Sequence, residues 1–586
     1  MVVGEEKDFA ARFSAVLQRP IQMTPPPTRA RLALLSALAP CVLLASADSA
    51  AESLQISSDP FTDEFGQHMT EVEPHVFAYG PVLVATFQMG RMFGGGCSDI
   101  GFSTSVDRGL TWQDGSLPGL TIFSGGDRYP SVSDPAVAYD VRHGLWLIVS
   151  LAVGGRPAAI FISRSGDGLH WDNPITAATA EAFFDKPWIA CDNSTSSRFF
   201  GNCYIEWDDV SAGLQVLMST STDGGATWSA PAATADEAAG LAGEPLVRDD
   251  GQVVVPYRGL GNLSAFVSDD GGQTWGNSVQ IAELVDHIVE GDFRAIALPS
   301  AAIDGDGKIY VAWHDCRFRS SCQANDIVFS TSADGLAWSK PSRVPLAALS
   351  SSAEFFIPAL GADRNTSAPN VSLGLVYYSY PDADCTPSTC ELAAGFVRSA
   401  NGGATWSAPI DVTPRMSLDW LAATSQGRMV GDYLGVAFTD DGIPHPIFAG
   451  AVQPSDQFLE SMFTCTDCPA NVAAQMQSEC VGGANCPAER AQVEADRSGL
   501  TASNDSALKI LAPATRVNIG TVLPLEVTGP ASANGAIEWW VEEGPAGGTV
   551  SNAGVYRAPV RPGTYHVVAR NGSDQARLTI EVFTVQ

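Results

Sequence analysis

The sequence has few basic residues for its length. Lys and Arg together number 33 against 65 Asp and Glu, so the 586-residue chain carries a formal charge of −32. This excess of negative charge argues against nucleic acid and anionic membranes as partners. It also provides no long-range attraction for an anionic sugar, although a local cluster of arginines is still able to hold one.

Long hydrophobic runs are missing as well. The one apolar stretch of note, residues 32–44, has about 13 residues, whereas a transmembrane helix needs roughly 20. Two arginines precede it and a small-residue Ala-Ser-Ala sequence follows it, which is the pattern of an export signal. We therefore expect residues 1–47 to be an export signal, with Met23 as a candidate start, and the protein to be secreted. A membrane anchor is the alternative.

Cysteine is scarce, with 12 residues in the chain, but most of it is closely paired. Close pairs in an exported protein predict disulfide bonds that hold loops. Zinc is the alternative for a cluster of four near the C-terminus, and we otherwise expect no cofactor, with a structural calcium ion left open. The pairs are Cys191 with Cys203, Cys316 with Cys322 and Cys385 with Cys390; the cluster is Cys465, Cys468, Cys480 and Cys486; Cys41 lies in the expected export signal; and Cys97 is left over.

What the chain does have is six copies of a short motif that begins with Ser and ends with Trp. Inside each copy an Asp, or an Asn in the sixth, precedes Gly. Gly permits positive φ and the Asp accepts backbone hydrogen bonds, so each copy predicts a turn between two strands, with the Asp in a structural role. The copies are Ser105–Trp112, Ser165–Trp171, Ser221–Trp228, Ser268–Trp275, Ser332–Trp338 and Ser399–Trp406.

The spacing of the motif predicts the fold. A repeat at a period of roughly 45–70 residues with four short strands in each unit is typical of a β-propeller. We expect an all-β propeller over residues 52–452, with six blades that carry the motif and a seventh that closes the ring. The strand 53–57 would join strands after Gly431 in that closing blade. A six-bladed ring is the alternative.

The motif resembles the Asp box, also called the BNR repeat, of bacterial sialidases and their relatives.

The region that follows the expected propeller has a different sequence pattern. Residues 453–504 read as a Cys-rich linker, and residues 505–586 as a small β-sandwich. The run 547–559 resembles a bacterial Ig-like module, and such modules contact cell walls or cell-surface polymers.

An acidic residue stands beside the proline that opens the inner strand in several blades. In a propeller these strand ends meet around the central channel. They predict a ring of carboxylates that binds a cation or sugar hydroxyls, or that supplies a catalytic acid. The alternative is that acid–proline pairs simply begin strands. The residues are Glu73, Asp134, Asp185, Glu244 and, in the closing blade, Asp432.

The resemblance to sialidases implies a specific set of catalytic groups. The family uses a Tyr nucleophile assisted by a Glu, with an Asp as acid/base. Tyr433, next to Asp432, is the candidate nucleophile, and Glu290 and Asp134 are the further candidate carboxylates. Blade structure alone is the alternative explanation for Gly-Asp-Tyr.

The resemblance also implies three arginines that bind the carboxylate of the sugar. The candidates are Arg91, Arg294, Arg317 and Arg428. The family's first arginine lies in a Tyr/Phe-Arg-Ile-Pro motif, and this chain has Glu71-Val72-Glu73-Pro74 at that point.

Three functions are consistent with these residues. The resemblance implies an exo-α-sialidase-like glycoside hydrolase that acts on glycans, as a monomer. A propeller at the cell surface that binds glycan or protein without catalysis is the second. The third is a glycosidase that uses two ring carboxylates, roughly 5–10 Å apart, on a neutral or cationic sugar.

Overall fold

The computed structural model describes two all-β regions. The first comprises residues 53–155, 157–453 and 460–465, and the second comprises segments between 509 and 583. The predicted export signal and Cys468, Cys480 and Cys486 lie outside the described residues. Among the residues that are described, no helix has the length and apolar character needed to cross a membrane.

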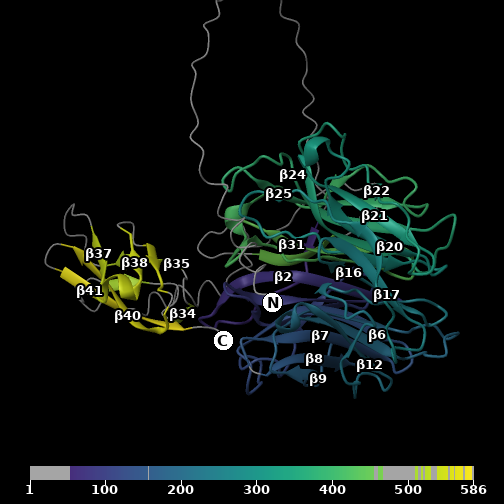
Figure 1. Ribbon diagram of the computed structural model, residues 1–586, viewed down its shortest axis with the longest axis horizontal. Coiled ribbons are helices and arrows are strands. Elements are labelled where there is room, and N and C mark those ends of the chain that lie inside the picture. Colours follow the sequence, from purple (N-terminus) through teal and green to yellow (C-terminus); the bar gives the residue numbers. More distant parts are fainter. Residues whose placement is uncertain are drawn as a thin grey trace, which may run out of the picture. The chain divides into compact units, whose positions relative to one another are not determined.

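The first region is built from consecutive units of four or five strands, which Figure 1 shows in purple to green. Blade 1 has β2 (Gly66–Tyr79), β3 (Val82–Met92), β4 (Cys97–Ser105) and β5 (Gln113–Ser116). Blade 2 has β6 (Ser131–Asp140), β7 (Leu145–Val153), β8 (Ala158–Ser165) and β9 (Ile175–Ala180). Blade 3 has β10 (Phe184–Cys191), β11 (Cys203–Asp209), β12 (Gln215–Ser221) and β13 (Ala232–Ala233), with the 3₁₀ turn η1 (Val210–Ala212).

Blades 4 to 6 repeat the arrangement. Blade 4 has β14 (Gly240–Leu241), β15 (Leu246–Val247), β16 (Val253–Gly259), β17 (Asn262–Ser268) and β18 (Val279–Glu283). Blade 5 has β19 (Ser300–Ile303), β20 (Ile309–Asp315), β21 (Asp326–Ser332) and β22 (Ser342–Arg343), with η2 (Ser320–Cys322). Blade 6 has β23 (Glu354–Ala362), β24 (Leu373–Tyr380), β25 (Glu391–Ser399), β26 (Ile410–Asp411) and β27 (Met416–Ser417). The chain then forms η3 (Leu418–Trp420) and the hairpin of β28 (Ala422–Thr424) and β29 (Gly427–Met429).

The closing blade joins the two ends of the propeller. It contains β30 (Gly435–Phe438), β31 (Pro444–Ala451), β32 (Glu460–Cys465) and, from the start of the region, β1 (Ser53–Gln55). These four strands pair antiparallel in that order, with Ser53 opposite Cys465. The seventh blade follows the prediction, but the propeller extends to Cys465, past the predicted limit at 452. β32 lies within the predicted linker but belongs to the closing blade, because it pairs with β31 on one side and with β1 on the other.

Seven inner strands form the ring around the channel. In the described residues, each of β2, β6, β10, β15, β19, β23 and β30 contacts the next, and β30 returns to β2. Because strand direction alternates within a blade, all inner strands begin at one end of the ring. The Asp boxes, which connect the third and fourth strands, lie at the opposite end. We call the end where the inner strands begin the mouth end.

The Asp boxes are turns held by their own side chains. In the third copy, Asp223 accepts hydrogen bonds from the Thr227 amide (2.9 Å) and hydroxyl (2.6 Å), and Ser221 Oγ accepts from the Gly225 amide (2.9 Å). The Trp228 indole donates to the Gly225 carbonyl at 3.2 Å. The carboxylate is therefore used within its own turn, which confirms the structural role expected of the Asp.

The three close cysteine pairs form disulfides, as expected. They are Cys191–Cys203, Cys316–Cys322 and Cys385–Cys390. Cys97 is buried and free.

The C-terminal region is also all-β and appears in yellow in Figure 1. Its buried residues, among them Val541, Tyr556, Val567 and Ile580, form a core of their own. That it is Ig-like stays a prediction. Its elements are β33 (Lys509–Leu511), β34 (Arg516–Asn518), β35 (Val522–Pro524), β36 (Glu526–Thr528), β37 (Glu538–Val541), η4 (Gly544–Gly547), β38 (Thr549–Val550), β39 (Val555–Arg557), β40 (Gly563–Asn571) and β41 (Asp574–Phe583).

Candidate functional site at the mouth of the channel

The inner strands carry a repeated irregularity just before their proline. In four blades the residue before proline has a left-handed backbone, with φ between 46° and 56°, and the strand register shifts at that point. Such a bulge bends the strand and redirects one side chain. Since this backbone is unfavourable for a non-glycine residue, the surrounding structure must hold it in place. The four residues are Glu73, Asp134, Lys186 and Ile357.

Three of these bulges meet around one ammonium group. Lys186 Nζ lies 2.7 Å from Asp134 Oδ1, 2.6 Å from Asp432 Oδ2 and 3.6 Å from Glu73 Oε1. Each of these four side chains is at most 5% exposed. The three carboxylates belong to blades 1, 2 and 7, and Lys186 belongs to blade 3. The predicted acidic ring is thus a buried ion cluster around a lysine.

Arg294 joins the cluster from the connection between blades 4 and 5. Its Nε donates to Asp432 Oδ1 at 2.8 Å, and its Nη2 donates to Asp432 Oδ2. A fork of two hydrogen bonds fixes the guanidinium in one orientation. The Arg294 side chain is 17% exposed, so it is the member of the cluster that reaches solvent.

The cluster changes the pKa values of its carboxyl groups in opposite directions. Burial, followed by the charge of Asp134, raises the pKa of Glu73 to about 8. Burial acts in the same sense on Asp432, but Arg294 and Lys186 outweigh it and hold the pKa of Asp432 below its ordinary value. Lys186 does the same for the pKa of Asp134. Near neutral pH, Asp432 and Asp134 are therefore ionised while Glu73 holds its proton.

Tyr433 points away from solvent. Its hydroxyl donates to the Pro135 carbonyl at 3.1 Å, and its ring packs edge-on against Trp188 with centroids 5.1 Å apart. His75 also packs edge-on against Trp188, with ring centroids 4.5 Å apart. Burial and then the negative charge of Glu73 raise the pKa of Tyr433 well above its ordinary value. The hydroxyl is thus protonated, and its hydrogen is used by a backbone carbonyl.

Of the other predicted carboxylates, Asp185 is next to Lys186 in the chain and accepts a hydrogen bond from its amide at 3.0 Å, whereas Glu244 and Glu290 make no contact with the lysine in the described part of the chain. Burial raises the pKa of Asp185 to about 6. Glu244 accepts a hydrogen bond from the Ala301 amide at 2.6 Å, between blades 4 and 5, and burial raises its pKa to about 8. Glu290 is exposed on the connection that leads to Arg294.

The other three predicted arginines bind separate partners. Arg91 donates to the Gly96 carbonyl at 2.7 Å. Arg428 donates to the Leu421 carbonyl at 2.8 Å, although its backbone pairs with that of residues 292–294. Arg317 forms a fork with Asp315 at 2.7 and 2.6 Å. Within the described residues these side chains share no hydrogen-bond partner with that of Arg294, and the three-arginine clamp stays a prediction.

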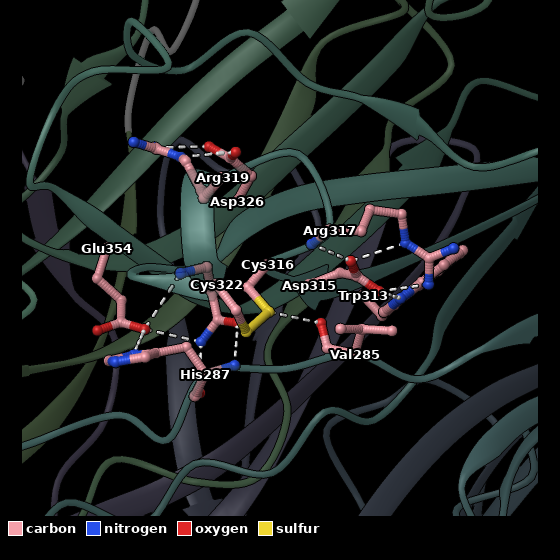
Figure 2. The surroundings of a disulfide bond; sticks show 11 residues. Val285, His287, Trp313, Asp315, Cys316, Arg317, Arg319, Cys322, Asp326 and Glu354 are labelled. Atoms are coloured by element: carbon pink, nitrogen blue, oxygen red, sulfur yellow. Dashed lines mark hydrogen bonds and ion pairs between the residues drawn. A yellow bond between two sulfur atoms is a disulfide. The ribbon is translucent and has the colours of Figure 1, made fainter.

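Figure 2 shows Arg317 beside Asp315, next to the disulfide of the same loop. The Cys316–Cys322 disulfide closes the loop after β20, and the Cys316 amide donates to the Val285 carbonyl at 2.8 Å. On the other side of the disulfide, His287 contacts Glu354 at 2.9 Å. The loop therefore fastens the connection from blade 4 to blade 5, which carries Arg294.

Sequence reasoning missed Lys186 and two further buried acids. Lys186 stands directly before Pro187, as Glu73 and Asp134 stand before their prolines, and this shared position was an available signal. Glu206 and Asp208 lie on β11, and burial raises the pKa of each well above its ordinary value. They gave no such signal, because they lie on a second strand rather than beside a proline.

The comparisons with known proteins agree with the repeats. A family described as the BNR repeat-like domain matches residues 154–359. No curated protein matches the chain. The matched residues 154–359 hold four of the six predicted Asp-box motifs, so the family match agrees with the repeats read from the sequence.

Several solved structures are similar to the chain at low identity. The Hadza microbial sialidase Hz136 is 18% identical over 56% of this chain and 66% of that chain, just under two thirds of its length, with a TM-score of 0.37. The NanB sialidase of Streptococcus pneumoniae is 14% identical over 69% of each chain, with a TM-score of 0.34. A PL25 ulvan lyase is 13% identical over 71% of this chain and 96% of that chain, with a TM-score of 0.41.

Proposed function

We propose that this protein is a BNR-repeat propeller that binds glycans at its mouth end without cleaving them. The observation that carries the proposal is the anchoring of Arg294. Two of its nitrogens are fixed on Asp432, and in the described residues its Nη1 makes no hydrogen bond. A cation that is pre-oriented in this way is suited to the hydroxyl or carboxylate groups of a sugar.

The state of Tyr433 supports binding over hydrolysis. A nucleophile must be able to lose its proton toward a nearby base and reach the substrate. The Tyr433 hydroxyl donates instead to the Pro135 carbonyl, and the residue is 8% exposed. The remaining predicted arginines are engaged elsewhere, so the groups that hold a sialic acid carboxylate are reduced to Arg294.

Exo-α-sialidase activity is the second candidate function. One observation favours it: Tyr433 directly follows Asp432, whose carboxylate binds Arg294, so a tyrosine, a carboxylate and an arginine occur together at the mouth end. For this chemistry Tyr433 would have to leave Pro135 and turn toward the substrate.

A single set of variants tests both candidates. The purified chain is applied to an array of sialylated and neutral oligosaccharides, and hydrolysis of a fluorogenic sialoside is followed in parallel. We expect glycan binding that falls at least tenfold in Arg294→Gln and less in Arg294→Lys, with no release of fluorophore. Arg198→Gln, an exposed arginine at the Asp-box end, is the control.

Two results would overturn the proposal. One is the failure of every glycan to bind, or binding that is unchanged in Arg294→Gln. The other is sialoside hydrolysis that disappears in Tyr433→Phe but persists in Tyr377→Phe, another buried tyrosine; that result would establish the second candidate. Circular dichroism of each variant separates loss of function from loss of fold.

A further inference from the structure

A hollow of about 600 Å³ lies at the mouth end of blade 1, away from the lysine cluster. One wall is the segment that leads into β2, and the other is the loop that follows β5. The lining combines aromatic rings with hydroxyl and carboxylate groups. Its members include Phe61, Thr62, Asp63, Ser116, Phe123 and Ser124.

The wall before β2 is held by two aspartates. Asp59 accepts hydrogen bonds from the amides of Phe61 and Met69, each at 2.9 Å. Asp63 Oδ1 accepts from the amides of Phe65 and Gly66, each at 3.0 Å. Side chains that bind the backbone of their own segment fix its path, so this wall is ordered before any ligand arrives.

The opposite wall is fixed in the same manner. The Gly119 amide donates to the Ser124 carbonyl and the Gly126 amide to the Thr121 carbonyl, both at 2.8 Å. Thr121 Oγ1 anchors the loop on the Ser98 carbonyl of β4, also at 2.8 Å. The rings of Phe65 and Phe123 connect the two walls, with their centroids 6.3 Å apart.

One polar atom in the hollow is left unsatisfied. Asp63 Oδ2 is buried and has no hydrogen-bond partner among the described residues, and the His68 ring nitrogen Nε2 is 4.0 Å away, beyond hydrogen-bond distance. The Asp63 side chain is 7% exposed. A buried acceptor without a partner is costly, and a donor on a bound ligand would remove that cost.

We propose that this hollow is a second sugar-binding site, which takes one neutral hexose unit of a glycan chain. Phe61 and Phe123 supply apolar rings for the C–H face of the sugar, and Asp63 Oδ2 accepts a hydroxyl hydrogen. Ser116, Ser124 and Thr62 offer hydroxyl groups for the remaining contacts. The lining contains no arginine or lysine, so the carboxylate of Asp63 would repel the carboxylate of an acidic sugar such as a uronic or sialic acid. This inference rests on the proposed glycan binding and adds a site and a sugar class to it.

The test measures binding of neutral and acidic oligosaccharides to the purified chain by saturation-transfer NMR and calorimetry. The probes are glucose-, galactose- and mannose-terminated trisaccharides, together with their sialylated counterparts. We expect at least one neutral probe to bind, and its affinity to fall tenfold or more in Phe123→Ala and in Asp63→Ala. Phe183→Ala is the matched control, because Phe183 is 56% exposed at the same end of the propeller in another connection.

The outcomes separate this site from the mouth. Neutral binding that is lost in Phe123→Ala but retained in Arg294→Gln supports the hollow. Neutral binding that is unchanged in Phe123→Ala and Asp63→Ala overturns the hollow and leaves the proposed function standing. If no probe of either class binds, both proposals fail. Thermal unfolding of the variants shows whether the wall has kept its fold.

Discussion

The Lys186 ammonium group lies 2.6 Å from the Asp432 carboxylate, and this contact joins blade 3 to the closing blade across the mouth of the channel. The same ammonium contacts Asp134 and Glu73, in blades 2 and 1. The three consecutive blades 1 to 3 and the closing blade, which is distant from them in the sequence, therefore meet at one buried cation. The net contribution of such a cluster to the free energy of unfolding is small, because each ion has been removed from water. Removal of one partner is nevertheless strongly destabilising, because it leaves a buried charge unpaired.

Replacement of Lys186 by Met is expected to destabilise the propeller by about 3–5 kcal/mol, because it leaves buried carboxylates without their cation. The measurement is urea unfolding of the propeller at pH 7. The deficit should shrink at pH 5, since the unpaired carboxylates can then be protonated. Lys340→Met, at an exposed position, is the control and should change stability by less than about 0.5 kcal/mol. Equal effects of the two substitutions would rule out a central role for the cluster.

Glu244 is expected to make the propeller less stable as the pH rises. Its pKa is raised from 4.5 to about 8 in the folded protein, so between these values the folded state holds a proton that the unfolded state has lost. That contribution is complete below pH 4.5 and is lost as the pH rises through 8, at up to roughly 1.4 kcal/mol per pH unit. Glu244→Gln keeps the acceptor for the Ala301 amide and removes the titration. The variant should therefore gain stability over the native chain between pH 5 and pH 8. The measurement is chemical denaturation of both proteins at pH 5 and at pH 8. The same stability difference between variant and native chain at the two pH values would contradict the raised pKa of Glu244.

The sequence could predict those parts of the structure that depend on local chemistry. The Asp boxes are recognisable because Ser, Asp, Gly and Trp make their contacts within eight residues of one another. The closing blade is also predictable, since an unpaired ring would leave exposed strand edges. The lysine cluster was only half predictable. Asp185 is the acid beside the proline in blade 3, yet the bulge places its neighbour Lys186 at the centre. Which residue turns inward depends on a left-handed backbone that only the folded strand reveals.

The pairing of Arg294 with Asp432 is a different case. The two residues are 138 positions apart, and no repeat relates them. Arg317 looks equally suitable in the sequence, but Asp315, two residues before it, holds its guanidinium. A local partner of this kind makes an arginine unavailable to a distant site. The sequence does not reveal such a partner unless the end of the strand, here β20 at Asp315, is already known.

The Asp boxes should tolerate Asn but not Ala. In the sixth copy Asn401 already accepts from the Thr405 amide at 2.9 Å and donates to the Thr405 hydroxyl at 2.8 Å. Asp223→Asn should consequently leave stability within about 0.5 kcal/mol of the native value, whereas Asp223→Ala loses both bonds and should cost about 1–2 kcal/mol. Chemical denaturation of the two variants measures the difference. If Asn proves as damaging as Ala, charge rather than hydrogen bonding holds the turn.

The Cys316–Cys322 disulfide is expected to order the connection that carries Arg294. The closed loop is short, so removing the bond in a double Ser variant should cost about 2 kcal/mol. The effect on hydrogen exchange in the neighbouring connection is more diagnostic than this change in global stability. The Cys316 amide holds the Val285 carbonyl, and the Asn325 side chain both donates to the His287 carbonyl and accepts from its amide. Loosening the loop should therefore speed hydrogen exchange over residues 283–292 at least tenfold. A double Ser variant of Cys191 and Cys203, whose disulfide lies in blade 3, should lower stability without changing exchange in that segment. Unchanged exchange in the first variant would show that the connection to Arg294 is ordered by its other contacts alone.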